Sequence, residues 1–421
     1  MGQIKSPFLN VLQERGYIHQ ATDLEGLDQR LCTSMVSAYM GFDATSNSLH
    51  IGNLVGIMML RHLQHFGHRP VVLLGGGTTK IGDPSGKDES RKLLSATDIQ
   101  HNTQQISKIF YQFLKVGNQT NQAAIVNNAE WLDPLKYIDF LRDFGRHFSI
   151  NRMLSFDSVR LRLEREQTLS FLEFNYMILQ AYDFLHLSRH QNCLLQLGGS
   201  DQWGNIISGI ELARRVDNRE LFGLCNPLIT NSSGAKMGKT VSGAIWLDKT
   251  KLTPYDYWQY WRNCSDQDVG RFLKLFTELP MDEIKRLEAL QGSELNEAKI
   301  ILADATTSLA HGKDEAKKAA LSAKKTFEQG GLGEELPALV ISSKELQQGI
   351  ALYDLLRRAG MAASNSEARR LIKAGGARLN DQPITDDLYM VNWQDYQHQQ
   401  VIKISAGRKR HTIVKLDHIP K

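Results

Sequence analysis

Short apolar segments, each followed by a polar or glycine-rich loop, recur along the first 225 residues and alternate with longer helical patterns. Clear examples are VVLLGGG at 71–77, AAIV at 123–126 and CLLQLGG at 193–199. Apolar runs of this length that alternate with helices are typical of buried strands in a parallel sheet. The sequence therefore predicts an α/β fold, in which ligands bind beyond the carboxyl ends of the strands.

The pattern changes after residue 250. Helical periodicity with many charged residues continues to about residue 325, and the glycine-rich, acidic stretch FEQGGLGEELPALVISSKE that follows is typical of a linker. The last part combines a short helix, for which Ser364 and Glu367 predict a capping box, with a short strand and a hairpin that has a basic tip. We therefore divide the chain into a domain at 1–248, a helical domain at 249–326, a linker at 327–349 and a small domain at 350–421.

Charge and cysteine content limit the class of protein. Residues 350–421 hold 12 Lys and Arg against 7 Asp and Glu, whereas the whole chain has a formal net charge of only +4, so a basic tail follows a nearly neutral body. Such a tail indicates a polyanionic partner. The four cysteines lie far apart without a Cys-x-x-Cys pair, which argues against zinc and predicts reduced thiols. No apolar run approaches the ~18 residues that span a bilayer and the amino end lacks a secretory pattern, so we expect a cytoplasmic protein that binds no membrane and no metal.

The string GGSDQWGN at 198–205 follows the third predicted strand. Its glycines allow a ligand to approach the backbone closely, and Asp201 and Gln202 supply hydrogen-bonding groups at the carboxyl end of that strand. A plain strand-to-helix turn with Asp201 as the N-cap explains the string equally well.

The loop NSSGAKMGKTVSG at 231–243 contains two lysines three residues apart, Lys236 and Lys239. Ammonium groups on a Gly- and Ser-rich loop suit a clamp on a phosphate chain, because they can follow charge as it develops. A solvated surface loop is the simpler interpretation of this stretch taken alone.

The string LHIGN at 49–53 precedes a helix in which Met59, Leu63 and Phe66 share one face. A helix amino terminus offers free N–H groups to an anion, His50 can donate to a phosphate oxygen, and Gly52 leaves room for a nucleotide. A histidine there is more often a surface residue. Three such strings in one α/β half favour a nucleotide site.

Longer strings carry a resemblance to a known family. YMGFDAT, GDPSGK, NYMILQAYDF and GGSDQWGN occur in this order within residues 35–250, HIGN matches the HIGH signature and KMGKT matches the KMSKS signature. The chain thus resembles the class I aminoacyl-tRNA synthetases, and closely the bacterial-type tyrosyl-tRNA synthetases. Its tail resembles a small RNA-binding module named for a protein of the small ribosomal subunit. It departs from the signatures at Asn53, where the family pattern has histidine, and at Gly238 and Thr240, where it has serines.

The resemblance implies a Rossmann-like catalytic domain, an α-helical tRNA-binding domain and a small α+β RNA-binding domain. It implies an enzyme that activates L-tyrosine with ATP and Mg²⁺ to tyrosyl-adenylate, releases pyrophosphate and transfers tyrosine to tRNA(Tyr). Because the substrate carboxylate is already ionised, no general base is needed, and catalysis depends on positioning and charge stabilisation. Family members are homodimers, which implies a homodimer here.

The resemblance also assigns roles to individual residues. Tyr176, Gln180 and Asp183 have the spacing of one helix face, as a pocket wall requires. The tyrosine-binding residues would be Tyr39, Asp83, Tyr176, Gln180, Asp183 and Gln202. The catalytic residues would be Thr45, His50, Lys236 and Lys239. The ATP-binding residues would be Gly41, Asp43, His50, Gly52, Asn53, Gly199, Asp201, Lys236 and Lys239. The RNA-binding residues would be Arg369, Arg370, Lys373, Arg378, Arg408, Lys409 and Arg410.

Other functions fit parts of the sequence. A tryptophanyl-tRNA synthetase shares the fold and the order of motifs, but the pairing of Tyr39 with Asp183 favours a phenol as substrate. A small-molecule adenylyltransferase would leave residues 250–421 without a role. A non-catalytic RNA-binding protein on the same scaffold is disfavoured, because His50, Lys236 and Lys239 are all present.

Overall fold

A computed structural model of the chain describes residues 3–85, 93–232, 234, 237–240, 243–328, 337–396, 402–407 and 410–417, and for 239, 240 and 325–328 it describes the backbone alone. The chain divides into two compact units. The first comprises Met1–Lys239, Ala244–Asp248 and Gln267–Ala289, and the second comprises Thr240–Gly243, Lys249–Asp266 and Leu290–Lys421. Residues 267–289 thus pack with the first unit, although they lie inside the predicted helical domain. The four-part division stays a prediction.

The first unit contains a six-stranded sheet whose strands follow the order β1-β6-β5-β2-β3-β4. All neighbours pair in parallel except β1 (Gln20–Ala21), which is antiparallel to β6. The predicted α/β fold is confirmed. The chain leaves β2 for β3 on one side, whereas β5 lies on the other, and a ligand crevice forms where connections diverge in this way. The parallel strands are β2 (Ser37–Asp43), β3 (Arg69–Gly75), β4 (Ala124–Asn127), β5 (Cys193–Gly199) and β6 (Phe222–Asn226).

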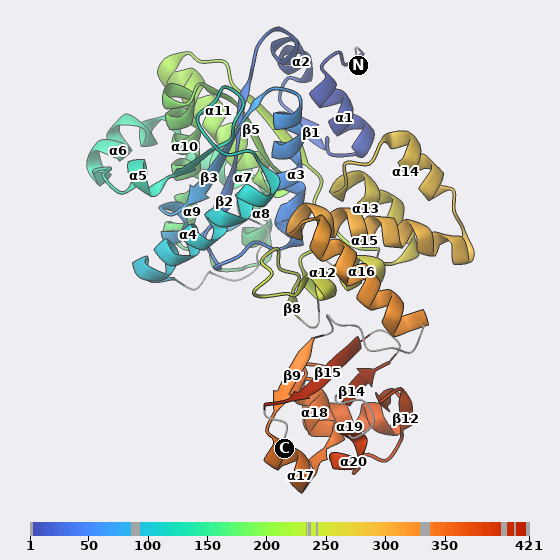
Figure 1. The fold of residues 1–421 in the computed structure, drawn as a ribbon. Helices are drawn as coiled ribbons and strands as arrows, with labels where there is room; N and C mark the ends of the chain where they lie inside the picture. The colour runs from blue at the N-terminus through green and yellow to red at the C-terminus, as the bar shows by residue number, and fades with distance from the viewer. Residues whose placement is uncertain are drawn as a thin grey trace. The chain divides into compact units, whose positions relative to one another are not determined.

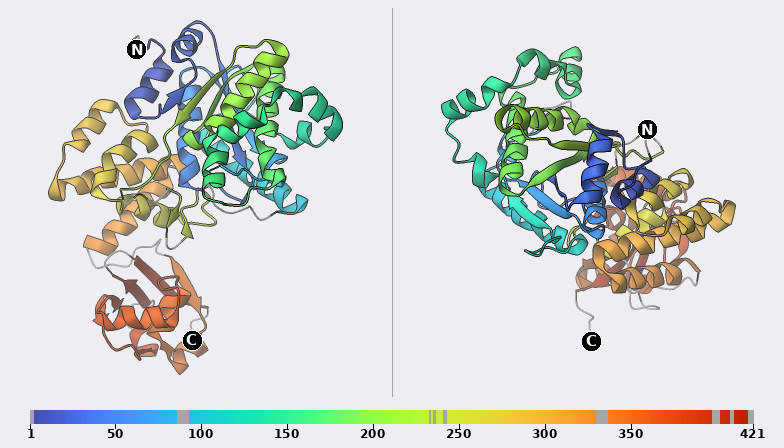
Figure 2. Two further views of the ribbon diagram at one scale, coloured as in Figure 1. Left: turned by 180° about the vertical axis from the view of Figure 1, so that it is seen from behind. Right: turned by 90° about the horizontal axis from the view of Figure 1, so that it is seen from above.

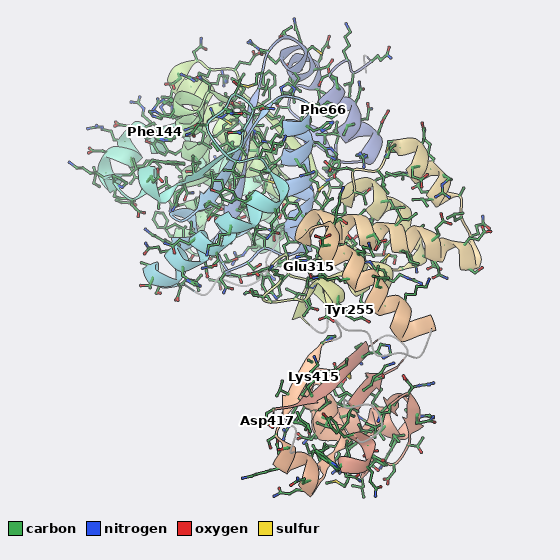
Figure 3. All side chains as sticks on the ribbon, viewed as in Figure 1. Phe66, Phe144, Tyr255, Glu315, Lys415 and Asp417 are labelled. Carbon is green, nitrogen blue, oxygen red and sulfur yellow. The ribbon has the colours of Figure 1, made fainter. Side chains whose placement is uncertain are left out.

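Helices cover both faces of this sheet (Figures 1 and 2). Side chains alternate between the faces of a strand, so Tyr39 packs against Phe184 of one helix layer while Phe42 packs against Phe110 of the other. Figure 3 shows side chains filling the space between the sheet and its helices. One layer contains α10 (Tyr176–His190) and α11 (Trp203–Asp217), and the other contains α3 (Ile51–His65) and α4 (Ala96–Phe113).

Between β4 and α10 the chain forms an insertion of short helices. A small apolar core holds them together, and a buried ion pair joins Arg162 to Glu173 at 3.1 Å. The buried members of this core are Phe140, Met153, Val159, Met177 and Ile178. The helices are α5 (Ala129–Leu132), α6 (Tyr137–Asp143), α7 (Ile150–Ser155), α8 (Asp157–Glu164) and α9 (Phe171–Phe174).

The second unit contains helices and a separate five-stranded sheet of order β12-β11-β14-β15-β9. The helices before residue 329 are α12 (Pro254–Arg262), α15 (Leu295–His311) and α16 (Lys313–Glu328). The later elements include α17 (Ser343–Gln348), α18 (Leu352–Arg358), α19 (Asn365–Lys373), β11 (Ala377–Leu379) and β12 (Gln382–Ile384). In the described part of the chain, no helix is both long and apolar enough to cross a membrane.

The second half of the predicted linker at 327–349 contains a strand and a helix. Strand β9 (Ala338–Ile341) pairs in parallel with β15 (Arg410–Leu416), so this segment belongs to the sheet. The glycine and acidic residues before it hid a short apolar run whose partner lies some seventy residues further along the chain. The predicted hairpin is confirmed, because β14 (Ile402–Ala406) and β15 are antiparallel neighbours.

The predicted capping box on α19 is half right. The Ser364 hydroxyl accepts a hydrogen bond from the N–H of Glu367 at 3.2 Å, as an N-cap does. The carboxylate of Glu367, however, accepts from the N–H of Ala363 at 2.7 Å, one residue before the position that closes a capping box.

A buried arginine joins two helices of the first unit. Arg15, the last residue of α1 (Pro7–Arg15), donates to the carbonyls of Lys274, Thr277 and Leu279 at 3.0, 2.8 and 2.6 Å. These carbonyls lie at and beyond the end of α13 (Val269–Phe276), where backbone acceptors lack partners within the helix and a cation is favoured.

We expect Arg15→Ala to lower the free energy of unfolding by about 3 kcal/mol, because it leaves several buried carbonyls unpaired. Urea denaturation followed by circular dichroism measures the change. Arg30→Ala is the control: its partner Glu220 is 3.4 Å away and both side chains are exposed, so the expected change is below about 0.5 kcal/mol. Equal effects of the two variants would contradict the role of Arg15.

Candidate functional site

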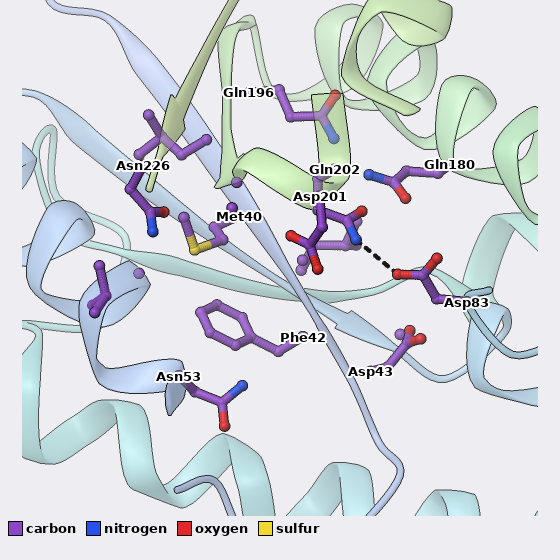
Figure 4. Close-up of a pocket in the computed structure, with 18 of the residues that line it drawn as sticks. Met40, Phe42, Asp43, Asn53, Asp83, Gln180, Gln196, Asp201, Gln202 and Asn226 are labelled. Carbon is purple, nitrogen blue, oxygen red and sulfur yellow. Dashed lines mark hydrogen bonds between the residues drawn. The ribbon is translucent and has the colours of Figure 1, made fainter. Parts of the chain in front are cut away.

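A cavity of about 330 Å³ opens at the carboxyl ends of β2, β3 and β5. Ligand pockets of proteins start at about this size. Its wall is formed by residues of the first unit, and Figure 4 shows the polar side chains that converge on it from the strands, from α10 and from the loop after β5. The geometry matches the place where open parallel sheets bind ligands.

One end of the cavity presents a buried carboxylate and a buried phenol. Asp183 of α10 accepts hydrogen bonds from the Asn128 amide at 2.9 Å and from the Trp131 indole at 2.7 Å. Tyr39 of β2 also lines the cavity and is 1 % exposed, and within the described structure its hydroxyl has no hydrogen-bond partner. A buried hydroxyl without a partner requires an explanation, and the adjoining cavity offers one, because a ligand there could complete its hydrogen bonds.

Burial controls the protonation of this end. It raises the pKa of Asp183 to about 7, despite the two hydrogen bonds that favour the carboxylate. Burial, with the nearby charge of Asp183, holds the pKa of Tyr39 well above its usual value. Burial, followed by the charges of Asp43 and Asp83, does the same for the pKa of Tyr176. Both phenols therefore keep their protons at neutral pH and can donate.

The adjoining wall is a hydrogen-bonded set of carboxylates and amides. Gln202 donates to Asp83 at 2.7 Å, as Figure 4 shows, and Asn205 donates to Gln180 at 2.9 Å and to Gln202 at 3.1 Å. Each amide is fixed by its neighbours, so this wall is rigid before any ligand binds.

The same wall continues to Asp43, the last residue of β2. Its carboxylate accepts from the Tyr176 hydroxyl at 3.1 Å and from the Thr78 hydroxyl at 2.9 Å. Asp43 thereby links α10 to the loop after β3, and the expected helix face of Tyr176, Gln180 and Asp183 does line the cavity.

The other end of the cavity is the amino terminus of α3. His50 is its N-cap, and His50 Nδ1 accepts the N–H of Gly52 at 3.0 Å. In the neutral imidazole the proton is therefore on Nε2, which can donate to a ligand. The amide of Asn53 accepts the backbone N–H of His50 at 3.2 Å and completes a capping box. Asparagine at this position thus has a structural role in the turn.

The loop that contains KMGKT runs beside this helix start. The N–H of Ile51 bonds to the carbonyl of Ile245 at 3.0 Å, and the N–H of Leu247 bonds to that of Leu49 at 2.9 Å. Gly238 has φ +111°, and a Cβ there would lie 2.5 Å from His50 Nδ1. A serine at 238 would collide with His50, so this arrangement requires glycine.

The described lining carries several carboxylates and no Lys or Arg. Asp43, Asp83, Asp183 and Asp201 all line the cavity. Cations for a phosphate chain would therefore come from the KMGKT lysines, of which Lys236 and the side chain of Lys239 lie outside the described residues. In that same described part, no group of three or more His, Cys, Asp or Glu is arranged to hold a metal ion.

The structure brings together most of the residues that the sequence singled out. Thr45 is the exception: it is exposed on the loop after β2 and is not part of the cavity wall. Asp201 does not cap α11, since Gln202 precedes the helix there and makes no side-chain cap. The predicted residues on the wall are Tyr39, Gly41, Asp43, His50, Gly52, Asn53, Asp83, Tyr176, Gln180, Asp183, Gly199, Asp201 and Gln202.

Two functional residues were missed from the sequence. Asn128 follows β4 directly, and the string IVNN at the end of a predicted strand was the available signal. Trp131 lies on the four-residue helix α5, which gives no usable periodicity. Both were hidden because their role depends on Asp183, more than fifty residues away in sequence.

The basic residues of the tail are mostly on its surface. Arg370, Lys373 and Arg378 are exposed, and Lys373 lies 3.4 Å from Asp387. Arg369 is half-buried and stacks over the Tyr353 ring at 4.3 Å, which makes it the least available of the set. Arg410 is exposed at the start of β15. The remaining two predicted RNA-binding residues, Arg408 and Lys409, lie outside the described residues.

Comparison with protein families assigns both parts of the chain. Residues 33–328 match the family described as tRNA synthetases class I (W and Y). Residues 328–414 match the tyrosine–tRNA ligase SYY-like C-terminal domain. The boundary between the two matches falls at residue 328, the end of α16.

Relatives are similar over the whole chain. A protein from Rhodospirillum rubrum named tyrosine–tRNA ligase is 58 % identical over 98 % of this chain and 98 % of its own length, and one of the same name from Zymomonas mobilis is 58 % identical over 99 % and 100 %. Among solved structures, a C-terminally truncated mitochondrial tyrosyl-tRNA synthetase from Coccidioides posadasii is 31 % identical, has a TM-score of 0.66 and covers 75 % of this chain and 92 % of its own. A tryptophan-bound tryptophanyl-tRNA synthetase from Encephalitozoon cuniculi, 14 % identical with a TM-score of 0.53, covers 73 % and 87 % and shares the fold.

The raised pKa of Asp183 makes a prediction about stability. The folded pKa of about 7 exceeds the unfolded value of 3.8, so the folded state holds the proton more tightly. The contribution of the protonated Asp183 carboxyl group to the free energy of unfolding is fully present below the unfolded pKa, and it is lost as pH rises through the folded pKa. We expect the wild type to lose about 1.4 kcal/mol per pH unit relative to Asp183→Asn between pH 4 and 7, with no further loss above. Urea denaturation of both proteins across this range measures the difference, and parallel curves would contradict it.

Proposed function

The chain belongs to the class I tRNA synthetases of the tryptophan and tyrosine group, and we propose that it is a tyrosine–tRNA ligase that uses the cavity at the carboxyl end of β2 for both of its reactions. Its relatives at 54–58 % identity over nearly the whole chain bear that name. The residues assigned to each role below rest on the geometry of this cavity.

The observation that carries the proposal is the pairing of Tyr39 with Asp183. A phenol hydroxyl both donates and accepts one hydrogen bond. The Asp183 carboxylate can accept its proton, and the Tyr39 hydroxyl, which has no partner among the described residues, can donate to its oxygen. An indole N–H could use only the acceptor, and phenylalanine could use neither, so each would leave a buried polar group unpaired. This difference supports tyrosine over tryptophan and phenylalanine.

The wall of carboxylates and amides suits the α-ammonium group of the amino acid. Asp83 and the Gln180 oxygen are acceptors, and the Tyr176 hydroxyl adds a third oxygen. Gln202 holds Asp83 in place and would face the substrate backbone. Because these groups are already bonded to one another, binding requires little reordering of side chains.

The nucleotide would lie toward the start of α3. The positive end of this helix's dipole and the Nε2 proton of His50 would face the phosphates, and Gly41, Gly52 and Gly199 would leave room for the adenosine, with Asp201 toward the ribose. The substrate is ATP with its own Mg²⁺, which the phosphates and water would hold. Lys236 and Lys239 would neutralise the acidic cavity as the phosphates enter. The exposure of Thr45 weakens its assignment as a catalytic residue.

The first reaction is attack of the tyrosine carboxylate on the α-phosphorus of ATP, with pyrophosphate leaving. In the second, the terminal ribose hydroxyl of the tRNA attacks the carbonyl of tyrosyl-adenylate and AMP leaves. The exposed Arg370, Lys373, Arg378 and Arg410 would contact the tRNA phosphates, which adds affinity and salt dependence without sequence specificity. The cytoplasm is the proposed location, and the absence of disulfides among the described cysteines supports it.

Tyrosine-dependent exchange of pyrophosphate into ATP tests the proposal. We expect exchange with tyrosine, and none above background with tryptophan or phenylalanine. Asp183→Ala should weaken tyrosine binding, because it removes the acceptor for the phenol. Lys239→Ala should lower kcat for the exchange by about 10²-fold, because it removes a charge that stabilises the transition state.

Each alternative outcome assigns a different function. Exchange with tryptophan would move the chain to the sister enzyme. Lack of exchange with every amino acid would leave an RNA-binding protein on a synthetase fold. Thr45→Ala serves as the matched comparison: a loss as large as that of Lys239→Ala would restore Thr45 to the catalytic set.

We also propose that the insertion between β4 and α10 joins two copies of the chain. The family resemblance implies a homodimer, and large apolar side chains are exposed on this insertion, with Ile138 72 % and Phe171 71 % exposed. Exposed apolar patches mark interfaces. The exposed large apolar residues of the insertion are Tyr137, Ile138, Ile150, Leu154, Leu161, Leu163, Phe171 and Leu172.

Light scattering during size-exclusion chromatography tests this interface. We expect the wild type to elute with twice the chain mass of 47.6 kDa, and the double variant Ile138→Glu, Phe171→Glu to elute as a monomer, because two charges would be buried without partners. Leu388→Glu, at an apolar residue of the tail that is 62 % exposed, is the control and should remain dimeric. A dimer in all three proteins would place the interface elsewhere.

A further inference from the structure

The segment from Pro227 to Ser232, here called the loop root, connects β6 to the KMGKT loop. Two of its residues, Leu228 and Ile229, line the cavity. The root also determines where the loop begins: Lys236 lies four residues beyond Ser232, a span of at most about 14 Å of chain. Displacement of the root would therefore displace the lysines.

A charged pair on helix α13 holds this root through its backbone. Asp268, 3 % exposed, accepts the N–H of Ser232 at 2.9 Å and the Arg271 guanidinium at 2.9 Å. Arg271 in turn donates to the carbonyl of Thr230. One side chain thus binds an N–H of the root and the other binds a carbonyl, which fixes both position and direction.

Asp268 stands at the start of α13, where its side chain would be expected to cap the helix. It is the N-cap residue of α13, where a carboxylate ordinarily accepts a backbone N–H of the first turn. Here the Asp268 side chain makes no cap to its own helix. Its two oxygens face the root and Arg271 instead, so helix capping does not explain the residue.

The loop root is connected in turn to the end of the cavity formed by the start of α3. The N–H of Met237 donates to the carbonyl of Ile229 at 2.9 Å, which ties the residue after Lys236 to the root. Gly238 follows and lies against His50, where even a Cβ would come within 2.5 Å of Nδ1. The contacts run without a gap from α13 to the root, to Met237 and Gly238, and to the start of α3.

We propose that Asp268 and Arg271 are positioning residues for the ATP step, which set the place of the KMGKT lysines by holding the loop root. The proposal rests on the proposed function, since it assumes that those lysines act on ATP. Neither residue lines the cavity, so each acts through the backbone that it binds. A displacement of about 1 Å in catalytic groups can cost up to about 10²-fold in rate.

The tyrosine slot should be insensitive to this pair. Asp83, Gln180 and Asp183 are held by hydrogen bonds from Gln202, Asn205, Asn128 and Trp131, none of which lies on α13. Tyr39 is fixed by its place in strand β2. Loss of the pair should therefore lower the catalytic efficiency with ATP and leave tyrosine binding unchanged. A general loss of folding would weaken both.

The experiment compares Asp268→Ala, Arg271→Ala, Arg271→Lys and the double alanine variant in the full-length chain. We expect kcat/KM for ATP in tyrosine-dependent exchange to fall about 10- to 100-fold in each alanine variant. The tyrosine dissociation constant, from equilibrium dialysis, should stay within about twofold. Arg271→Lys should recover part of the loss because it keeps a donor, and the double variant should be no worse than the worse single one, because the pair acts as a unit.

Lys274→Ala is the matched control. Lys274 lies one turn further along α13, and its ammonium group pairs with Glu288 at 2.8 Å instead of with the root, while its side chain is about as exposed as that of Arg271. It should keep wild-type exchange kinetics. Melting temperatures of all variants report folding separately.

Three results would overturn the inference. The first is wild-type kcat/KM for ATP in both alanine variants, and the second is an equal loss in tyrosine binding. The third is a loss in Lys274→Ala as large as in Arg271→Ala, because that would show a general effect of α13. All three require an active wild type, whereas a wild type without any exchange would instead reject the proposed function on which the inference rests.

Discussion

Strand β2 is hydrogen-bonded in parallel to β3 on one side and to β5 on the other, and the site depends on this pairing. The register places Tyr39 beside Val71 and Gln196, and Asp43 beside Gly75. Because side chains alternate along a strand, Tyr39 is directed toward the helix layer that carries Asp183. The proposed slot for the amino acid thus follows from sheet register and helix packing, and short loops complete it.

The acidic charge of the cavity means that the amino acid and the phosphates of ATP would have to be bound by different groups. The rigid wall is acidic, which suits an ammonium group and opposes a triphosphate. In the proposed function, the positive groups are the amino terminus of α3, His50 and the lysines of the KMGKT loop. An enzyme built in this way holds the amino acid with fixed side chains and meets the phosphates with a loop whose place must itself be controlled. We propose that the backbone contacts around Gly238 and the loop root provide that control.

Local patterns in the sequence were enough for strands β3, β4 and β5, for the start of α3 and for the helix face of Tyr176, Gln180 and Asp183, because each depends on residues close together in the chain. The parts that could not be predicted depend on distant partners. Strand β9 is defined by its pairing with β15, which lies far along the chain. Asn128 and Trp131 belong to the site because they bind Asp183, which is also distant in sequence. The exposure of Thr45 is likewise set by the path of a loop, which its motif does not encode.

The two donors on Asp183 have a consequence for changing what this enzyme accepts. The group that we propose to meet the substrate hydroxyl is a unit of three side chains, since the Asp183 carboxylate is oriented by Asn128 and Trp131. A designer who replaces Asp183 alone to admit an unnatural amino acid leaves an amide and an indole N–H directed at an acceptor that is gone. A library for altered specificity should therefore vary positions 128, 131 and 183 together, so that new side chains can satisfy one another.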